Sequence, residues 1–179
     1  MFGKIFKLPK PLAERTTNNE QRTTKLIMAL LQVGDKIPDL SSINENGEAI
    51  SLRQFEGKKL ALFFYPKSGT PGCTAEACSL RDYYAEIKAK GVEVLGVSPD
   101  PIKKQKGFIE KYNFPYSLIA DTDKTITQAF GAWGPKKFMG RSYEGTLRST
   151  FLIDENGIIE KVFDKVDTEE HAKQILEVL

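Results

Sequence analysis

From Gly34 onward, short apolar runs alternate with stretches in which apolar residues recur at helical spacing, and this alternation constrains the fold more than any other feature. Lys59–Tyr65 and Val92–Val97 are compact runs typical of buried strands. Between them, apolar residues recur at helical spacing from Cys73 to Gly91, which predicts a helix. A second helix and a third strand follow within residues 101–120. Because helix-linked strands favour parallel pairing, the sequence predicts an α/β fold.

The C-terminal part adds antiparallel strands to this pattern. Asn156-Gly157 separates two apolar runs, Leu147–Ile153 and Ile158–Phe163, and an Asn-Gly turn between such runs is typical of a β-hairpin. A last helix is predicted from Asp167 or Thr168 to the end of the chain. The expected architecture is a mixed central β-sheet with helices on both faces.

Positive charge is concentrated at the N-terminus. Residues 1–27 hold six Lys or Arg and two Asp or Glu, whereas the remaining 152 residues hold 20 and 22. This segment has no sustained apolar period, so we expect residues 1–33 to form a poorly ordered basic extension and residues 34–179 to form one domain. The apolar run Leu26–Leu31 is shorter than the roughly 7–15 residues of a signal-peptide core and begins unusually far into the chain. We therefore expect a cytoplasmic protein.

Composition excludes several function classes. The formal net charge of +2 is too small to attract nucleic acid or an anionic membrane. One histidine cannot build a multi-histidine zinc site, and two cysteines are too few for a disulfide-scaffolded secreted fold. No stretch approaches the roughly 18–20 apolar residues of a membrane span. We expect neither a nucleic-acid partner nor membrane association.

The segment that carries chemistry runs from Tyr65 to Cys78, where a buried strand ends, a Gly/Pro-rich loop follows and a helix begins at Cys73. A helix N-terminus offers unpaired N–H groups and the positive end of a dipole, and both favour the nucleophilic thiolate. The alternative is that Cys73 packs in the core as a small apolar residue. The Pro71-Gly72-Cys73 sequence favours the reactive thiol.

Cys78 lies five residues after Cys73. In an intact α-helix this spacing puts the two side chains on different faces, with Cα atoms roughly 8–9 Å apart. A disulfide requires Cα atoms within about 7 Å. Either the two cysteines never pair, or this turn of the helix unwinds before they do.

Four motifs resemble one family, the peroxiredoxins. Pro66-x-x-x-Thr70-x-x-Cys73 is similar to their active-site signature, and the position of Cys78 is similar to that of the resolving cysteine in the bacterioferritin-comigratory, or peroxiredoxin Q, subfamily. The segments Trp133–Gly140 and Arg148–Asp154 resemble the same subfamily. The likeness extends from about Leu31 to Leu179 and implies a thioredoxin-like fold.

The resemblance implies a role for each matching residue. Cys73 would be the peroxidatic cysteine, oxidised to a sulfenic acid by hydrogen peroxide or a small organic hydroperoxide. Thr70 would align the sulfur with the attacked oxygen, Arg148 would stabilise the thiolate, and Pro66 would cover the site. Cys78 would resolve the sulfenic acid as an intramolecular disulfide. A thioredoxin-like protein would reduce that disulfide, with no metal or organic cofactor, and the subfamily implies a monomer.

Three other functions remain open at this point. A thiol–disulfide exchange protein without peroxidase activity would share the fold, but the five-residue offset and Thr70 argue against it. A copper-binding assembly module would need a Cys-x-x-x-Cys pair with a nearby histidine. In a redox-silent interaction domain, Cys73 would be inert.

Several further residues are not assigned to the site. Trp133 is predicted to pack or to anchor a loop, and the run Lys103, Lys104 and Lys106 to form a solvated helix face. His171 is predicted to lie on the solvated face of the last helix, away from the cysteines. Glu76 could orient Arg148 or a backbone group, and the sequence alone does not place it.

Overall fold

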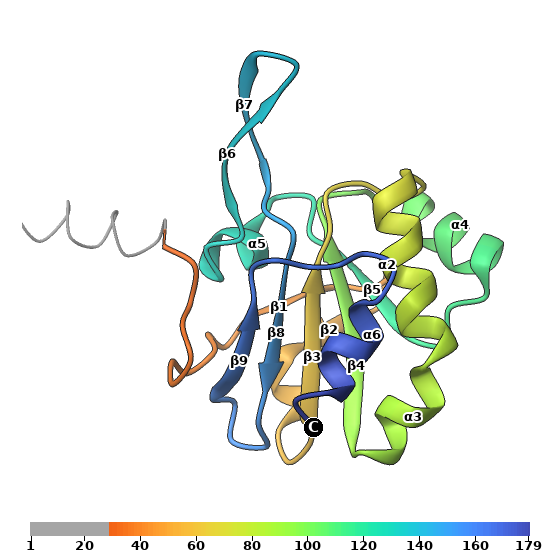
Figure 1. Cartoon of the computed structure of the whole chain (residues 1–179), viewed down its shortest axis with the longest axis vertical. Helices are drawn as coiled ribbons and strands as arrows, with labels where there is room; N and C mark the ends of the chain where they lie inside the picture. Colours follow the sequence, from red (N-terminus) through yellow and green to blue (C-terminus); the bar gives the residue numbers. More distant parts are fainter. Residues whose placement is uncertain (1–28) are drawn as a thin grey trace, which may run out of the picture.

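A computed structural model describes residues 29–179 of the chain. Its centre is a five-stranded sheet in the order β5-β4-β3-β8-β9 (Figure 1). The strands are β3 (Lys59–Phe64), β4 (Val92–Ser98), β5 (Ser117–Ala120), β8 (Ser149–Ile153) and β9 (Ile159–Phe163). The pairs β3–β4 and β4–β5 are parallel, whereas β3–β8 and β8–β9 are antiparallel. The predicted mixed sheet is confirmed.

Apolar side chains cover both faces of this sheet. Because successive strand residues point to opposite faces, Phe63 joins one core cluster and Phe64 the other. The Phe63 side packs against α2 (Pro71–Asp82), α3 (Tyr84–Ala89), α4 (Ile102–Tyr112) and α6 (His171–Leu176). The Phe64 side packs against α5 (Thr125–Ala129) and the 3-10 helix η1 (Leu52–Phe55). Helices therefore lie on both faces, as expected of a thioredoxin-like fold.

The helix predicted from Cys73 to Gly91 is two helices, α2 and α3. The first of these, α2, begins at Pro71 rather than at Cys73. Proline is favourable in the first turn of a helix, because its missing N–H costs no hydrogen bond there. Tyr83 separates α2 from α3, because its φ of −102° and ψ of 11° lie outside the α-helical range. The chain changes direction there, and Ile87 of α3 is buried in the same core cluster as β4 residues (Figure 1).

A hairpin that the sequence analysis did not predict projects from the body of the molecule (Figure 1). Its strands β6 (Trp133–Phe138) and β7 (Arg141–Thr146) pair antiparallel. Met139 and Gly140 both have positive φ, at 48° and 78°, as a tight hairpin turn requires. Most of its residues are polar or exposed, so no apolar alternation signals these strands.

The described part of the chain begins with residues 29–33, which the sequence analysis assigned to the N-terminal extension. Leu30 and Leu31 pack on the second core cluster, and the Leu31 N–H donates to Phe130 O at 3.1 Å. A short hairpin of β1 (Ser41–Ile43) and β2 (Ala49–Ser51) follows. The rest of the predicted extension, residues 1–28, lies outside the described residues. None of the helices within residues 29–179 is long and apolar enough to cross a membrane.

The C-terminal predictions agree with the structure in type but not in every boundary. The predicted hairpin is β8–β9, and Gly157 in its turn has a φ of 77°. The last α-helix begins at His171 rather than at Asp167 or Thr168. Asp167 still caps the preceding turn, because its carboxylate accepts the N–H groups of Glu169 and Glu170.

Candidate active site

Cys73 is the third residue of α2 and is 1 % exposed. The loop between β3 and α2 presents it, and this loop is fixed to the β4–α4 connection. The Ser68 N–H donates to Asp100 Oδ2 at 2.6 Å, and the Tyr65 hydroxyl donates to the buried side chain of Gln105. The sulfur therefore occupies a defined position at the N-terminus of a helix, as the sequence predicts.

Arg148 contacts the sulfur directly. Its Nη2 lies 3.3 Å from Cys73 Sγ, within hydrogen-bond distance for sulfur. The register of the sheet brings the two residues together. Ser149, the first residue of β8, pairs with Phe64, so Arg148 lies beside the loop that follows β3. The two residues that the sequence places 75 positions apart are thus neighbours.

Glu76 completes this cluster, and the sequence analysis did not place it. Its Oε2 accepts a hydrogen bond from Arg148 Nη1, while its Oε1 is buried with no hydrogen-bond partner. The side chain is fully buried, and burial raises the pKa of its carboxyl to about 7, against the opposing charge and hydrogen bond of Arg148. The spacing Cys73-x-x-Glu76, which puts both residues on one helix face, is the signal that could have indicated it.

Thr70 and Pro66 lie in the loop that leads to Cys73. Thr70 is the N-cap residue of α2, but its hydroxyl makes no capping bond and donates instead to Lys67 O at 2.9 Å. Both residues are half-buried. The Cys73 sulfur is hydrogen-bonded to Arg148 and to neither of these two residues.

Cys78 occupies a different environment within the same helix. It is half-buried and packs against the first core cluster, as do the partly buried Tyr83, Tyr84 and Tyr112. Burial raises the pKa of its thiol, and the charge of Arg81 opposes this rise. Both cysteines are free thiols, and α2 is continuous through them. The structure therefore shows the state in which the two sulfurs are held apart.

Lys136 is a second cation near the sulfur that the sequence analysis missed. Its Nζ donates to Thr146 O at 3.0 Å, two residues before Arg148. Its side chain crosses Gly145, where a Cβ would lie 3.2 Å from Lys136 Cδ. Burial and the charge of Arg148 lower the pKa of Lys136, and Cys73 opposes this, so the ammonium shares the electrostatic environment of the site.

The prediction for His171 is wrong: this residue is fully buried rather than solvated. Its Nε2 lies 2.7 Å from Thr150 Oγ1 and its Nδ1 lies 2.9 Å from Gln174 Oε1. The cause is the packing of α6 on the sheet, where the ring meets Phe163 edge-on. Burial lowers the pKa of His171. Because both ring nitrogens are engaged, His171 does not act as a base for Cys73.

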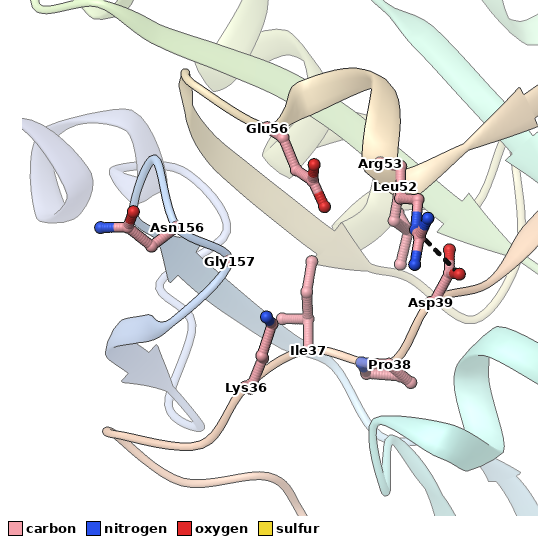
Figure 2. A pocket seen from close by; sticks show the side chains of 9 residues that line it. All are labelled: Lys36, Ile37, Pro38, Asp39, Leu52, Arg53, Glu56, Asn156 and Gly157. Carbon is pink, nitrogen blue, oxygen red and sulfur yellow. Dashed lines mark ion pairs between the residues drawn. The ribbon is translucent and has the colours of Figure 1, made fainter.

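A separate cavity of about 70 Å³ lies at the other end of the sheet (Figure 2). It is formed by the segment 36–39, by η1 and by the β8–β9 turn at Asn156-Gly157. An exposed ion pair between Arg53 and Asp39 lies at its edge, at 2.8 Å. None of its lining residues is a cysteine, and both cysteines lie in α2.

A buried cysteine at the start of a helix, after a central strand of a thioredoxin-like sheet and with a guanidinium on its sulfur, defines a thiol-dependent oxidoreductase. Comparison with known proteins gives the class more narrowly. Residues 33–162 match the AhpC/TSA family. The chain belongs to this family.

Its relatives include the putative peroxiredoxin bcp of Haemophilus influenzae, 46 % identical over 149 residues that cover 83 % of this chain and 96 % of the relative. Peroxiredoxin Bcp of Escherichia coli K12 is 44 % identical over 82 % of this chain and 94 % of its own length. A solved structure of the Xanthomonas campestris bacterioferritin comigratory protein, whose study concerns alkyl peroxide reduction, has a TM-score of 0.76 at 31 % identity, with 82 % of this chain and 96 % of that one covered. The protein is thus a peroxiredoxin, a thiol peroxidase, and the resemblance noted in the sequence is confirmed.

Proposed function

We propose that Cys73 is the peroxidatic cysteine and that it reduces hydrogen peroxide and small organic hydroperoxides. The observation that carries this proposal is the 3.3 Å contact between Arg148 Nη2 and Cys73 Sγ at the N-terminus of α2. A permanent positive charge and a helix dipole at one sulfur both favour the thiolate. Cys73 and Arg148 are the residues of the predicted set that the fold brings into direct contact.

In the first step the Cys73 thiolate attacks one peroxide oxygen. An S–O bond forms, the O–O bond breaks, and the departing oxygen takes a proton to leave as water or an alcohol. The sulfur is oxidised to a sulfenic acid and the peroxide is reduced. Arg148 stabilises the charge that moves to the departing oxygen, Thr70 aligns the peroxide through its hydroxyl, and Pro66 limits access to the site.

In the second step the Cys78 thiolate attacks the sulfenic sulfur. An S–S bond forms between Cys78 and Cys73, the S–O bond breaks, and the hydroxide takes a proton to leave as water. A thioredoxin-like protein then reduces the disulfide through a mixed disulfide. We place the reaction in a monomer in the cytoplasm, a compartment in which such reductants are kept reduced.

Peroxide consumption coupled to a thioredoxin system tests both steps. Cys73→Ser is expected to lose all turnover. Cys78→Ser is expected to retain one rapid oxidation of Cys73 but to lose thioredoxin-linked cycling. Mass spectrometry of wild-type protein treated with one equivalent of peroxide should show a Cys73–Cys78 disulfide. Normal turnover in Cys73→Ser would contradict the proposal.

A further inference from the structure

A buried hydrogen bond joins Tyr116, just before β5, to the middle of α2. The Tyr116 hydroxyl donates to the carbonyl oxygen of Ala77 at 2.6 Å. Tyr116 is 6 % exposed and Ala77 is fully buried, so water does not compete for either group. Ala77 lies between the two cysteines, one residue before Cys78.

Surrounding aromatic rings hold Tyr116 in place. Its ring stacks on Phe114 with centroids 5.5 Å apart, and it meets Phe63 edge-on at 5.9 Å. Tyr84 packs on it at 5.9 Å. Burial raises the pKa of Tyr116 well above its ordinary value, so the hydroxyl keeps its proton. The donor is therefore pre-oriented toward α2 and little entropy is lost in forming the bond.

Formation of the disulfide must break this bond. With α2 helical, the Cα atoms of residues five apart stand roughly 8–9 Å from each other, beyond the reach of about 7 Å for a disulfide. The residues between the cysteines, including Ala77, must leave the helix before the sulfurs meet. When Ala77 moves, its carbonyl oxygen separates from the fixed Tyr116 hydroxyl.

We propose that Tyr116 is a positioning residue that stabilises the helical form of the segment between the cysteines and so limits the rate at which Cys78 captures the sulfenic acid. The proposal rests on the proposed roles of Cys73 and Cys78. Slow capture gives a second peroxide time to oxidise the sulfenic acid to a sulfinic acid, in which the sulfur gains one oxygen and the peroxide leaves as water. Tyr116 thereby sets the division between disulfide formation and overoxidation.

Tyr116→Phe tests this proposal, because it removes the hydroxyl and keeps the ring. The Ala77 oxygen retains the backbone acceptor role that any helix gives it, so no buried group is left unpaired. After oxidation by hydrogen peroxide, the disulfide should form about 2- to 10-fold faster, as expected from the loss of one hydrogen bond. The fraction of sulfinic acid at a given peroxide concentration should fall accordingly. The rate of the first oxidation of Cys73 should be unchanged.

Tyr84→Phe is the matched control, since it removes a hydroxyl from a ring that packs on Tyr116 and should leave both rates unchanged. Hydrogen exchange gives a second measurement: amides of residues 74–78 should exchange faster in Tyr116→Phe than in the wild type. A structural defect alone would slow the oxidation of Cys73, whereas this proposal requires the resolving step alone to accelerate.

Unchanged or slower disulfide formation in Tyr116→Phe would overturn the proposal. Its failure is distinguishable from failure of the proposed function. If the wild type forms no Cys73–Cys78 disulfide, the proposed function fails. If the wild type forms the disulfide and Tyr116→Phe forms it at the same rate, only the role of Tyr116 is wrong.

Discussion

The two halves of α2 are held to the rest of the molecule by different forces. In the first half, Cys73 and Glu76 both contact Arg148, through a charged hydrogen bond and an ion pair. In the second half, Leu80 is buried in the core, Ser79 Oγ accepts the Ala172 N–H of α6, and Arg81 Nη1 donates to Tyr112 O. The half that holds Cys73 is attached through Arg148, whereas the half that holds Cys78 is attached by packing and by hydrogen bonds to α6 and α4.

This difference suits a two-step reaction. In the proposed reaction, oxidation of Cys73 changes the charge next to Arg148, so the first half of α2 would lose part of its attachment before the two cysteines pair. Ser79 and Arg81, which follow Cys78, do not bond to Arg148, so in the proposed reaction they keep Cys78 close. Four substitutions test the contrast, beginning with the largest expected effect.

Arg148→Met should remove the contacts that the first half of α2 makes through Cys73 and Glu76. Oxidation of Cys73 by peroxide is expected to slow by about 10²–10³-fold, because the thiolate and the departing oxygen both lose their nearest positive charge. Stopped-flow oxidation kinetics measure this, with Arg141→Met on the exposed end of the β6–β7 hairpin as the control. An oxidation rate equal to that of the control would remove Arg148 from the mechanism.

Glu76→Gln should change the rate of Cys73 oxidation by a factor that depends on pH. The pKa of Glu76 is raised to about 7 by burial, so the wild-type carboxyl is mostly neutral at pH 6 and mostly ionised at pH 8. The amide resembles the neutral form. We expect the variant to oxidise about 10-fold more slowly than the wild type at pH 8, where the Arg148 ion pair is lost, and about equally at pH 6. A ratio of the two rates that does not vary with pH would contradict this.

Lys136→Met should have a smaller effect on the same step. The ammonium is bonded to Thr146 O rather than to the sulfur, so its removal is expected to slow Cys73 oxidation by about 2- to 5-fold at low ionic strength. Lys136→Arg should restore the rate. Lys137→Met, on the neighbouring exposed position, should leave the rate unaltered. Equal effects of the two Met variants would show that only overall charge matters.

A substitution of His171 tests how α6 stabilises the second half of α2, because Ala172 of α6 donates its N–H to Ser79 Oγ. Burial lowers the pKa of His171 in the folded state, so below about pH 6.5 the unfolded chain binds the extra proton more readily. Stability should therefore fall as the pH drops from 7.5 through 6.5. Urea unfolding measured between pH 7.5 and pH 5.5 should show this loss of stability. In His171→Asn this loss should be smaller, and an identical loss would assign it to other groups.

The strand–loop–helix unit around Cys73 could be predicted from the sequence because its signals are local. A buried apolar run, a Pro/Gly loop and helical spacing each act within a few residues. The Asn156-Gly157 hairpin is predictable for the same reason. The β6–β7 hairpin is not, since its exposed, polar strands bury little apolar surface and leave no periodic pattern.

Burial of polar residues was the least predictable property. His171 stands on the last helix among charged neighbours, yet the docking of α6 against Thr150 and Phe163 encloses it completely. Glu76 likewise has no apolar signal. The partner that permits its burial, Arg148, lies 72 positions away.

The sequence by itself determined the class of fold, the cysteine at the start of a helix and, through its motifs, the family. Only the tertiary structure decided that Arg148 joins Glu76 to the Cys73 sulfur and that the Tyr116 hydroxyl donates to Ala77 O between the two cysteines. Periodicity and turn residues specify local conformation. Strand order and register decide which distant side chains meet, and these depend on how the whole core packs.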